Sequence, residues 1–525
     1  MSISGNAKKR KTMLYPIGIQ NFGKIREGGY VYVDKTDLIY NIVQTGGYYF
    51  LSRPRRFGKS LLISTLEAYF QGKKELFQGL AIENLEKDWS AYPVLHLDLS
   101  GKEYNTMDDL DVRLDRHLSQ WENSFGFEKR YPMADARFSD IIDAAYEKTG
   151  KPVVILIDEY DKPLLDTAGN EPLREAFRSR LQGFYSVMKS QDGKLRFGFL
   201  TGVTKLGKLS IFSGLNNLND ISMDYRYADI CGISESDLHA YFDGSVQEMA
   251  DANRMSKEEC YARLKDYYDG YHFCEESEDI YNPFSLLSAL NGQRFRDYWY
   301  ETGTPTFVVK ALRQGKFKLE DLTLEGVPYS ALGGVNADDS DPVPVLYQSG
   351  YLTIRSYDER RQRYSLKYPN QEVERGFMEC LAKTYIPTAS YYSPFDVQKF
   401  VDDFEKGDAE GLMKRFEAFF ADADYAIVGD AELYFQNTMY VMCKLMGQFV
   451  QVERHTSAGR MDILVQTEKY IYVMELKMDA SADEALQQIE EKGYAKPFAA
   501  DSRKLFRIGV NFSSSTRRIE EWKIA

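Results

Sequence analysis

The chain has 525 residues, of which 28% are charged and 43% are hydrophobic. One hydrophobic core rarely organises a chain of this length, so we expect about two to four domains. The composition excludes a disordered chain, and no apolar run reaches the roughly 18–20 residues of a membrane-spanning helix. The net charge is −13, so any contact with nucleic acid must come from a local basic patch or a bound metal.

The five cysteines are scattered along the sequence and include no C-x-x-C pair. This usage disfavours a disulfide framework and a zinc site, and it suits a reducing compartment. The N-terminal segment is basic, but no apolar stretch follows it, so no secretory signal is expected. We therefore expect a cytoplasmic protein without membrane association.

Four apolar runs in the first 205 residues predict buried parallel strands, because strands covered by helices on both faces are almost continuously hydrophobic. Apolar residues recur at helical spacing between the runs, as in residues 173–189. The pattern predicts an α/β fold with a doubly wound sheet. The runs cover residues 48–52, 94–99, 153–158 and 197–201.

The first run leads into Arg53-Pro-Arg-Arg-Phe-Gly-Lys-Ser60, and a helical stretch follows at residues 61–70. A phosphate-binding loop needs this order of strand, loop and helix, because the loop N–H groups and the helix N-terminus face the anion. Arg53 replaces the first glycine of the standard G-x-x-x-x-G-K-[ST] motif. We nevertheless expect Lys59 to neutralise the β- and γ-phosphates and Ser60 to contact Mg²⁺. The predicted cofactor-binding residues of the loop are Arg56, Gly58, Lys59 and Ser60.

The third run ends in Asp158 and Glu159, which places two carboxylates at the carboxyl end of a strand, where open α/β sheets bind ligands. Asp158 is predicted to hold Mg²⁺ together with Ser60, and Glu159 to orient or deprotonate the attacking water. Thr201, after the fourth run, is predicted to lie beside the γ-phosphate. An acidic pair alone is also compatible with a simple polar strand end, so the prediction rests on its combination with the loop.

Six segments carry a family resemblance, and they lie at residues 32–36, 53–60, 157–160, 268–273, 281–285 and 300–305. They resemble the bacterial AAA-ATPase-like family, which couples a P-loop ATPase domain to a C-terminal nuclease-like domain. The resemblance covers essentially the whole chain, and the family's own loop has the Arg-Pro-Arg-Arg-Phe-Gly-Lys-Ser form. It implies ATP and Mg²⁺ as ligands.

The composition becomes tyrosine-rich and helical from about Gly232, and an Asn-Pro pair predicts the start of a helix at residues 284–290. The resemblance implies a helical or winged-helix-like lid here. Aromatic residues such as Tyr271 and Phe273 either stack on bases or, as we favour, pack a core against the ATPase domain.

The C-terminal hundred residues predict strands at 449–453, 461–465 and 470–477, a helix at 483–494 and a strand at 506–512. Glu475 and Lys477 share one face of the third strand because side chains alternate along a strand. If the second and third strands pair, Asp462 approaches Glu475, and two carboxylates suit an open Mg²⁺ site. Lys477 is then placed to position a water for attack on a phosphodiester.

Asp462, Glu475 and Lys477 have the spacing of the PD-(D/E)XK nuclease pattern, and Gly459-Arg460 before the aspartate strengthens the match. The resemblance therefore implies a restriction-endonuclease-like α/β domain in which these three residues are catalytic. On the same resemblance, accessory residues would be Glu432, Glu453 and Gln488.

The expected domains are a P-loop ATPase at 1–230, a helical lid or connector at 231–365, a helical linker at 366–415 and a nuclease-like domain at 416–525. The favoured function is an ATP-dependent or ATP-regulated nuclease, with DNA favoured over RNA as the nucleic acid. Two alternatives stay open: a regulatory ATPase switch whose C-terminal domain only binds nucleic acid or a protein partner, and a scaffold with two inactive sites. The sequence also leaves open whether the ATPase subunits form an oligomer.

Overall fold

The computed structural model describes residues 13–128, 131–167, 169–205, 217–299, 319–322, 326–334, 341–385, 397–421, 431–447, 451–453 and 463–525. The chain divides into two compact units. The first comprises residues 1–311 and 323–373, and the second comprises residues 312–322 and 374–525.

The first unit contains a five-stranded parallel sheet in the order β2-β3-β4-β1-β5. The strands are β1 (Gly47–Ser52), β2 (Val94–Asp98), β3 (Val153–Asp158), β4 (Leu195–Gly202) and β5 (Leu218–Asp220). The first four confirm the predicted apolar runs and the α/β fold. The sequence did not reveal β5, because this edge strand has three residues and none of them is buried.

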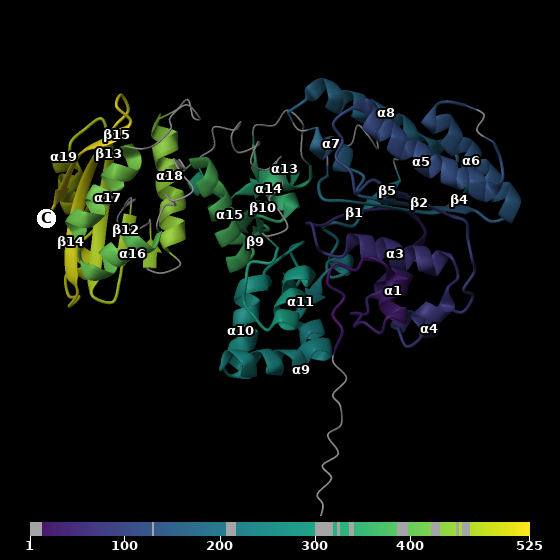
Figure 1. Ribbon diagram of the computed structural model, residues 1–525, viewed down its shortest axis with the longest axis horizontal. Helices are drawn as coiled ribbons and strands as arrows, with labels where there is room; N and C mark the ends of the chain where they lie inside the picture. Colours follow the sequence, from purple (N-terminus) through teal and green to yellow (C-terminus); the bar gives the residue numbers. More distant parts are fainter. Residues whose placement is uncertain are drawn as a thin grey trace, which may run out of the picture. The chain divides into compact units, whose positions relative to one another are not determined.

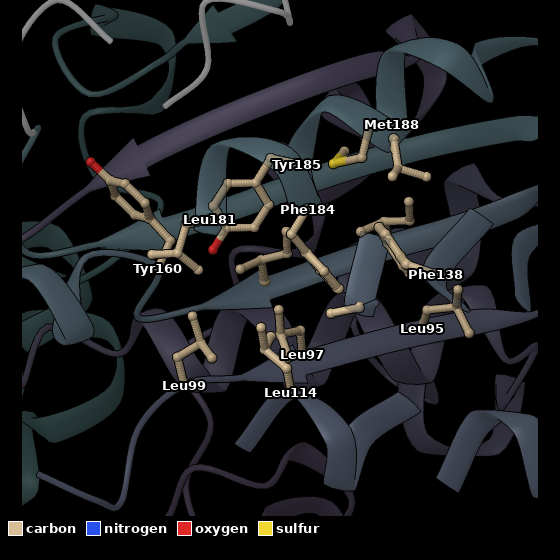
Figure 2. Packing of buried hydrophobic residues seen from close by; sticks show 14 of the residues in the cluster. Leu95, Leu97, Leu99, Leu114, Phe138, Tyr160, Leu181, Phe184, Tyr185 and Met188 are labelled. Atoms are coloured by element: carbon tan, nitrogen blue, oxygen red, sulfur yellow. The ribbon is translucent and has the colours of Figure 1, made fainter. Parts of the chain in front are cut away.

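Helices cover both faces of this sheet (Figure 1). One face packs against α5 (Met107–Phe125), α6 (Ala134–Thr149) and α8 (Glu171–Ser190), and the other packs against α3 (Lys59–Phe70). Figure 2 shows side chains of the sheet and of α5, α6 and α8 meeting in a continuous core. Phe138 and Phe184 stack there with ring centroids 4.3 Å apart. Burial on both faces explains the apolar runs in these strands, of which β3 is buried at every position.

Shorter helices complete the α/β part of this unit. They are α1 (Phe22–Glu27), α2 (Thr36–Thr45), α4 (Ala81–Leu85) and α7 (Lys162–Asp166). Single turns of 3₁₀ helix, in both units, are η1 (Lys74–Phe77), η2 (Asp192–Lys194), η4 (Tyr225–Tyr227), η6 (Leu319–Leu322) and η8 (Lys496–Phe498).

A helical cluster follows the sheet in sequence. It consists of β6 (Ile233–Ser234), α9 (Glu235–Asn253), α10 (Lys257–Tyr268), β7 (Ile280–Tyr281) and α11 (Pro283–Gly292). Asn282 caps α11 by accepting hydrogen bonds from the N–H groups of Phe284 and Ser285. The helix predicted from the Asn-Pro pair is therefore confirmed.

An antiparallel sheet in the order β8-β10-β9 ends the first unit. Two short helices lie in sequence between its first and second strands. The elements are β8 (Val327–Pro328), α13 (Tyr329–Leu332), α14 (Val343–Ser349), β9 (Thr353–Asp358) and β10 (Arg363–Lys367). Helix α15 (Gln371–Tyr385) then carries the chain into the second unit.

The second unit contains a mixed sheet in the order β11-β12-β13-β14-β15, in which only β13 and β14 are parallel. Its strands are β11 (Gln451–Glu453), β12 (Ile463–Gln466), β13 (Tyr470–Met478), β14 (Lys504–Ser513) and β15 (Arg518–Ile524). Its helices are α16 (Val397–Lys406), α17 (Ala409–Ala421), α18 (Ala431–Met446) and α19 (Ala482–Lys492). The predicted strands and helix are present, whereas β15, a polar edge strand, was not predicted. No helix in the described ranges is long and apolar enough to cross a membrane.

Candidate functional sites

The loop between β1 and α3 leads directly into the N-terminus of a helix, the order of elements that an anion-binding loop requires. Gly58 precedes α3 with a φ of 96°, in the left-handed region that glycine adopts without steric cost. Lys59 and Ser60 begin α3, whose first turn contains no acidic residue, so its positive end suits an anion. Arg56 is exposed, and its guanidinium lies 4.8 Å above the ring of Phe284.

The Lys59 side chain is buried against its own loop. Its ammonium group donates hydrogen bonds to the carbonyl oxygens of Arg53 (2.9 Å) and Pro54 (3.1 Å). Burial lowers the pKa of Lys59, and the nearby carboxylates of Glu159 and Asp158 oppose that change. Phosphate oxygens are charged acceptors and bind an ammonium more strongly than neutral carbonyls do, so a bound phosphate would attract Lys59 away from them.

Arg53, which replaces the first glycine of the standard motif, has a structural role. Only 1% of this residue is exposed, and its guanidinium donates hydrogen bonds to the carbonyl oxygens of Ser222 (2.8 Å), Tyr227 (3.2 Å) and Ala228 (3.2 Å). The guanidinium carbon also lies 4.0 Å from the centre of the Phe273 ring. The arginine therefore ties the start of the loop to the segment that follows β5.

Aromatic side chains from the helical part of the unit support the rest of the loop. Phe57 makes edge contacts with Tyr271 and Phe273, at ring-centroid distances of 4.7 and 5.5 Å. The indole N–H of Trp299 donates to the carbonyl oxygen of Arg55 (3.2 Å). Tyr271 and Phe273 are buried, which supports the core-packing interpretation over base stacking.

Asp158 and Thr201 meet at the carboxyl end of the sheet. Thr201 pairs with Leu51 across β4 and β1, and its hydroxyl donates to the Asp158 carboxylate at 2.6 Å. Both side chains are buried. Because β4 lies between β1 and β3, the sheet brings the residues predicted at the ends of all three strands to one edge.

Glu159 has an unusual backbone conformation directly after β3. Its φ is 52°, a left-handed value that is uncommon for a residue other than glycine. The side chain is half-buried, and this burial raises the pKa of its carboxyl group, while nearby Lys59 acts in the opposite direction. Strained conformations of this kind cluster at active sites and switch regions.

The structure also reveals Asp161 at this edge, a residue that the sequence did not single out, in contact with Thr204. Asp161 is buried and accepts hydrogen bonds from the N–H groups of Thr204 (2.6 Å) and Val203 (3.1 Å) and from the Thr204 hydroxyl (2.8 Å). Burial raises the pKa of Asp161, and the Thr204 hydrogen bonds oppose the rise. Asp161 follows the predicted site residue Asp158 by three positions, and this nearness in sequence was the available signal.

The predicted C-terminal pair is joined by the predicted accessory glutamine. The Lys477 ammonium donates to Glu475 (3.2 Å) and to the side-chain oxygen of Gln488 (2.5 Å). The amide nitrogen of Gln488 also donates to Glu475, which is 2% exposed. Strand β13 and helix α19 thus bring a carboxylate, an ammonium and an amide together.

Gly509 allows α19 to approach the sheet beside Glu475, with which it pairs across β13 and β14. A Cβ atom on Gly509 would lie 2.3 Å from the carbonyl oxygen of Ala482 and 3.0 Å from the side chain of Leu486. The absence of a side chain at Gly509 is therefore a condition for the contact between Gln488 and strand β13.

Asp462 lies outside the residues that the structure describes, as do the side chains of Glu432 and Glu453. The backbones of the latter two belong to α18 and β11. Ile463, the first residue of β12, pairs with Met474, the residue immediately before Glu475.

The donor atoms at both sites suit Mg²⁺. The first site offers the Ser60 hydroxyl and the Asp158 carboxylate, and the second offers the Glu475 carboxylate. Mg²⁺ prefers such hard oxygen ligands, and it commonly binds one or two carboxylates plus water and substrate phosphate. Among the described residues, no three His, Cys, Asp or Glu side chains are grouped as a metal site, so neither site offers a complete protein cage there.

Comparison with known proteins agrees with this architecture. Residues 16–212 match the family described as "Predicted AAA-ATPase", and residues 430–522 match the "PD-(D/E)XK nuclease superfamily". The chain is 36% identical over 515 residues to a protein of Azotobacter chroococcum mcd 1 described as "Uncharacterized protein in vnfD 5'region". The alignment covers 96% of this chain and 97% of that protein. The chain therefore belongs to the same family as the Azotobacter protein, and it combines an AAA-ATPase-like domain with a C-terminal domain of the PD-(D/E)XK nuclease superfamily.

Proposed function

We propose that the protein hydrolyses ATP at the β1–α3 loop and uses or regulates a metal-dependent nuclease site in its C-terminal domain. The observation that carries the proposal is the convergence of Lys59, Asp158, Glu159 and Thr201 at one edge of the parallel sheet. DNA as the favoured nucleic acid and a cytoplasmic location are part of the same proposal.

In the ATPase reaction, the backbone N–H groups around Gly58 and the N-terminus of α3 bind the phosphates. Lys59 exchanges its loop carbonyl acceptors for β- and γ-phosphate oxygens. Ser60 and Asp158 would hold Mg²⁺, which neutralises charge on the phosphates. The Thr201 hydroxyl fixes the orientation of the Asp158 carboxylate.

Glu159 orients the attacking water and accepts its proton. A general base works best when its pKa is near the working pH, and burial moves the pKa of Glu159 upward in that direction. The same shift predicts that hydrolysis decreases as the pH falls and Glu159 becomes protonated.

In the nuclease reaction, Asp462 and Glu475 would hold a divalent metal ion, which polarises the scissile phosphate. The pairing of Ile463 with Met474 supports this assignment, since Asp462 and Glu475 are the next residues beyond that pair. Lys477 orients the water that attacks phosphorus, and Gln488 holds the Lys477 ammonium and the Glu475 carboxylate in place.

The test compares Lys59→Ala and Lys477→Ala with wild type in ATP hydrolysis and in cleavage of single- and double-stranded DNA and RNA, with Mg²⁺ or Mn²⁺, with and without ATP. Lys59→Ala should reduce ATP hydrolysis by about 100-fold or more. Lys477→Ala should abolish cleavage and leave ATP hydrolysis intact. Matched controls are the exposed lysines Lys73→Ala, near the end of α3, and Lys492→Ala, in the last turn of α19.

Each half of the proposal has its own contrary result. Wild-type protein that cleaves none of these substrates under any of the conditions refutes the nuclease activity. Nucleic-acid binding without cleavage would then favour the alternative of an ATPase switch with a binding-only C-terminal domain. ATP hydrolysis that persists in Lys59→Ala refutes the proposed nucleotide site.

A further inference from the structure

Trp299 contacts two segments that are far apart in sequence. Its indole N–H donates to the carbonyl oxygen of Arg55 in the nucleotide loop (3.2 Å), and its backbone N–H donates to the carboxylate of Glu372 (2.5 Å). Trp299 is 6% exposed and Glu372 is 1% exposed, so the hydrogen bond between them is buried, whereas the bond to Arg55 is partly buried. Buried hydrogen bonds to a carboxylate are strong and geometrically restrictive.

Glu372 lies in the first turn of α15, and this turn is also fixed from a second side. Asn370 caps the helix by accepting a hydrogen bond from the Val373 N–H (3.0 Å). The Asn370 side chain donates to the carbonyl oxygen of Asp269 (2.7 Å). Asp269 begins the short segment whose Phe273 ring packs against Phe57 of the nucleotide loop. The start of α15 is therefore attached to the loop by two routes.

Nucleotide binding must disturb the loop at the residues next to this attachment. Lys59 donates to the carbonyl oxygens of Arg53 and Pro54, and these two residues directly precede Arg55. When the Lys59 ammonium transfers to a phosphate, both carbonyl groups lose their donor, and the loop backbone must adjust. The adjustment reaches the Arg55 carbonyl, which the Trp299 indole holds.

We propose that Trp299 and Glu372 transmit the nucleotide state of the loop to α15 and, through that helix, to the second unit. The inference rests on the proposed ATP site and adds the route by which that site regulates the C-terminal domain. Helix α15 is continuous from Gln371 to Tyr385, and the second unit begins at Glu374 within it. A change at the first turn of a continuous helix is carried along the helix, because its backbone hydrogen bonds make it a stiff element.

The test is hydrogen–deuterium exchange of the full-length protein with and without saturating ATPγS, with nucleotide occupancy measured separately for each variant. We expect ATPγS to change the exchange rate of amides in residues 374–382 of wild type by several-fold. Trp299→Phe keeps an aromatic ring and removes the indole N–H, and Glu372→Ala removes the acceptor. Both substitutions should abolish the response of α15. The matched control is Trp121→Phe on α5, and this variant should keep the response of α15 to ATPγS.

The outcomes separate the coupling from the nucleotide site itself. If wild type binds ATPγS and exchange in α15 does not change, or if the nucleotide-loaded Trp299→Phe variant responds like wild type, the coupling is refuted and the nucleotide site stands. If wild type does not bind ATPγS, both the coupling and the proposed nucleotide site are refuted. Loss of the response in Trp299→Phe but not in Trp121→Phe supports the coupling, with or without detectable nuclease activity.

Discussion

Asp161 accepts two hydrogen bonds from Thr204, one from its backbone N–H at 2.6 Å and one from its hydroxyl at 2.8 Å. These bonds join the segment after β3, which carries Glu159, to the segment after β4, which follows Thr201. Both partners are buried, so an unpaired donor could not be satisfied by water. We therefore expect Asp161 to act as a positioning residue, because it joins two segments that carry proposed catalytic groups.

Asp161→Ala should lower the kcat of ATP hydrolysis on the order of 100-fold and change KM little, because misplaced catalytic groups slow the chemical step. Asp161→Asn keeps one acceptor oxygen, so its kcat should fall less than that of Asp161→Ala. Steady-state kinetics measures both constants. The control is Asp192→Asn, where the exposed aspartate accepts a hydrogen bond from the Tyr48 hydroxyl in another part of the domain. A raised KM with an unchanged kcat would contradict the positioning role.

Arg53→Gly restores the standard phosphate-loop motif, yet we expect it to destabilise the protein. The substitution leaves the buried carbonyl oxygens of Ser222, Tyr227 and Ala228 without the arginine donor and creates a cavity beside Phe273. The cost should be roughly 3 kcal/mol or more. Urea unfolding, followed by a spectroscopic signal from the ATPase domain, measures this loss in the free energy of unfolding. An unchanged or increased stability would show that the arginine has no structural role.

Asp269 should make the free energy of unfolding decrease as the pH rises. Burial raises the pKa of Asp269 to about 7 from its ordinary 3.8. The unfolded chain therefore binds fewer protons than the folded one between these values. The contribution is fully present below pH 3.8, is lost as the pH rises towards 7, and amounts to roughly 4 kcal/mol.

The side chain in Asp269→Asn stays neutral at every pH. Thermal unfolding measured between pH 5 and 8 should therefore show no such decrease in stability for the variant. At pH 8 the variant should be more stable than wild type. Asp266→Asn changes an exposed aspartate in α10, three residues before Asp269, and should retain the wild-type pH dependence. Equal pH profiles for wild type and Asp269→Asn would exclude Asp269 as the titrating group.

Gly509→Ala should move α19 away from the sheet beside β13, because its Cβ would lie 2.3 Å from the Ala482 carbonyl oxygen. We expect a loss of stability of about 1–3 kcal/mol from overpacking. Any nuclease activity should fall together with the Gln488 contact to Lys477, while ATP hydrolysis remains. Gly244→Ala on α9 is the control, since no atom lies within 4 Å of its Cβ. Full nuclease activity in Gly509→Ala would mean that Gln488 is dispensable.

The sequence predicted the elements whose signals are local. The first four strands of the parallel sheet each contain an apolar run, because helices cover both faces of the sheet. The helix after Asn282 was predicted from its own N-cap. Strands β5 and β15 were not predicted, because neither contains a run of buried apolar residues that would indicate a strand. Aromatic residues in the middle of the chain left two interpretations that only their burial could separate.

In the candidate sites, too, some features follow from local sequence and others from contacts between distant segments. The sequence by itself determined the chemistry: the Gly-Lys-Ser loop, the Asp-Glu strand end and the Glu-x-Lys strand each state which groups are available, because the spacing of these residues follows from the regular geometry of one element. Tertiary structure alone decided the contacts of Arg53, Asp161 and Trp299. Their partners are backbone and side-chain groups from other segments, up to 244 residues away in the case of Trp299 and Arg55, and no local pattern encodes such a contact.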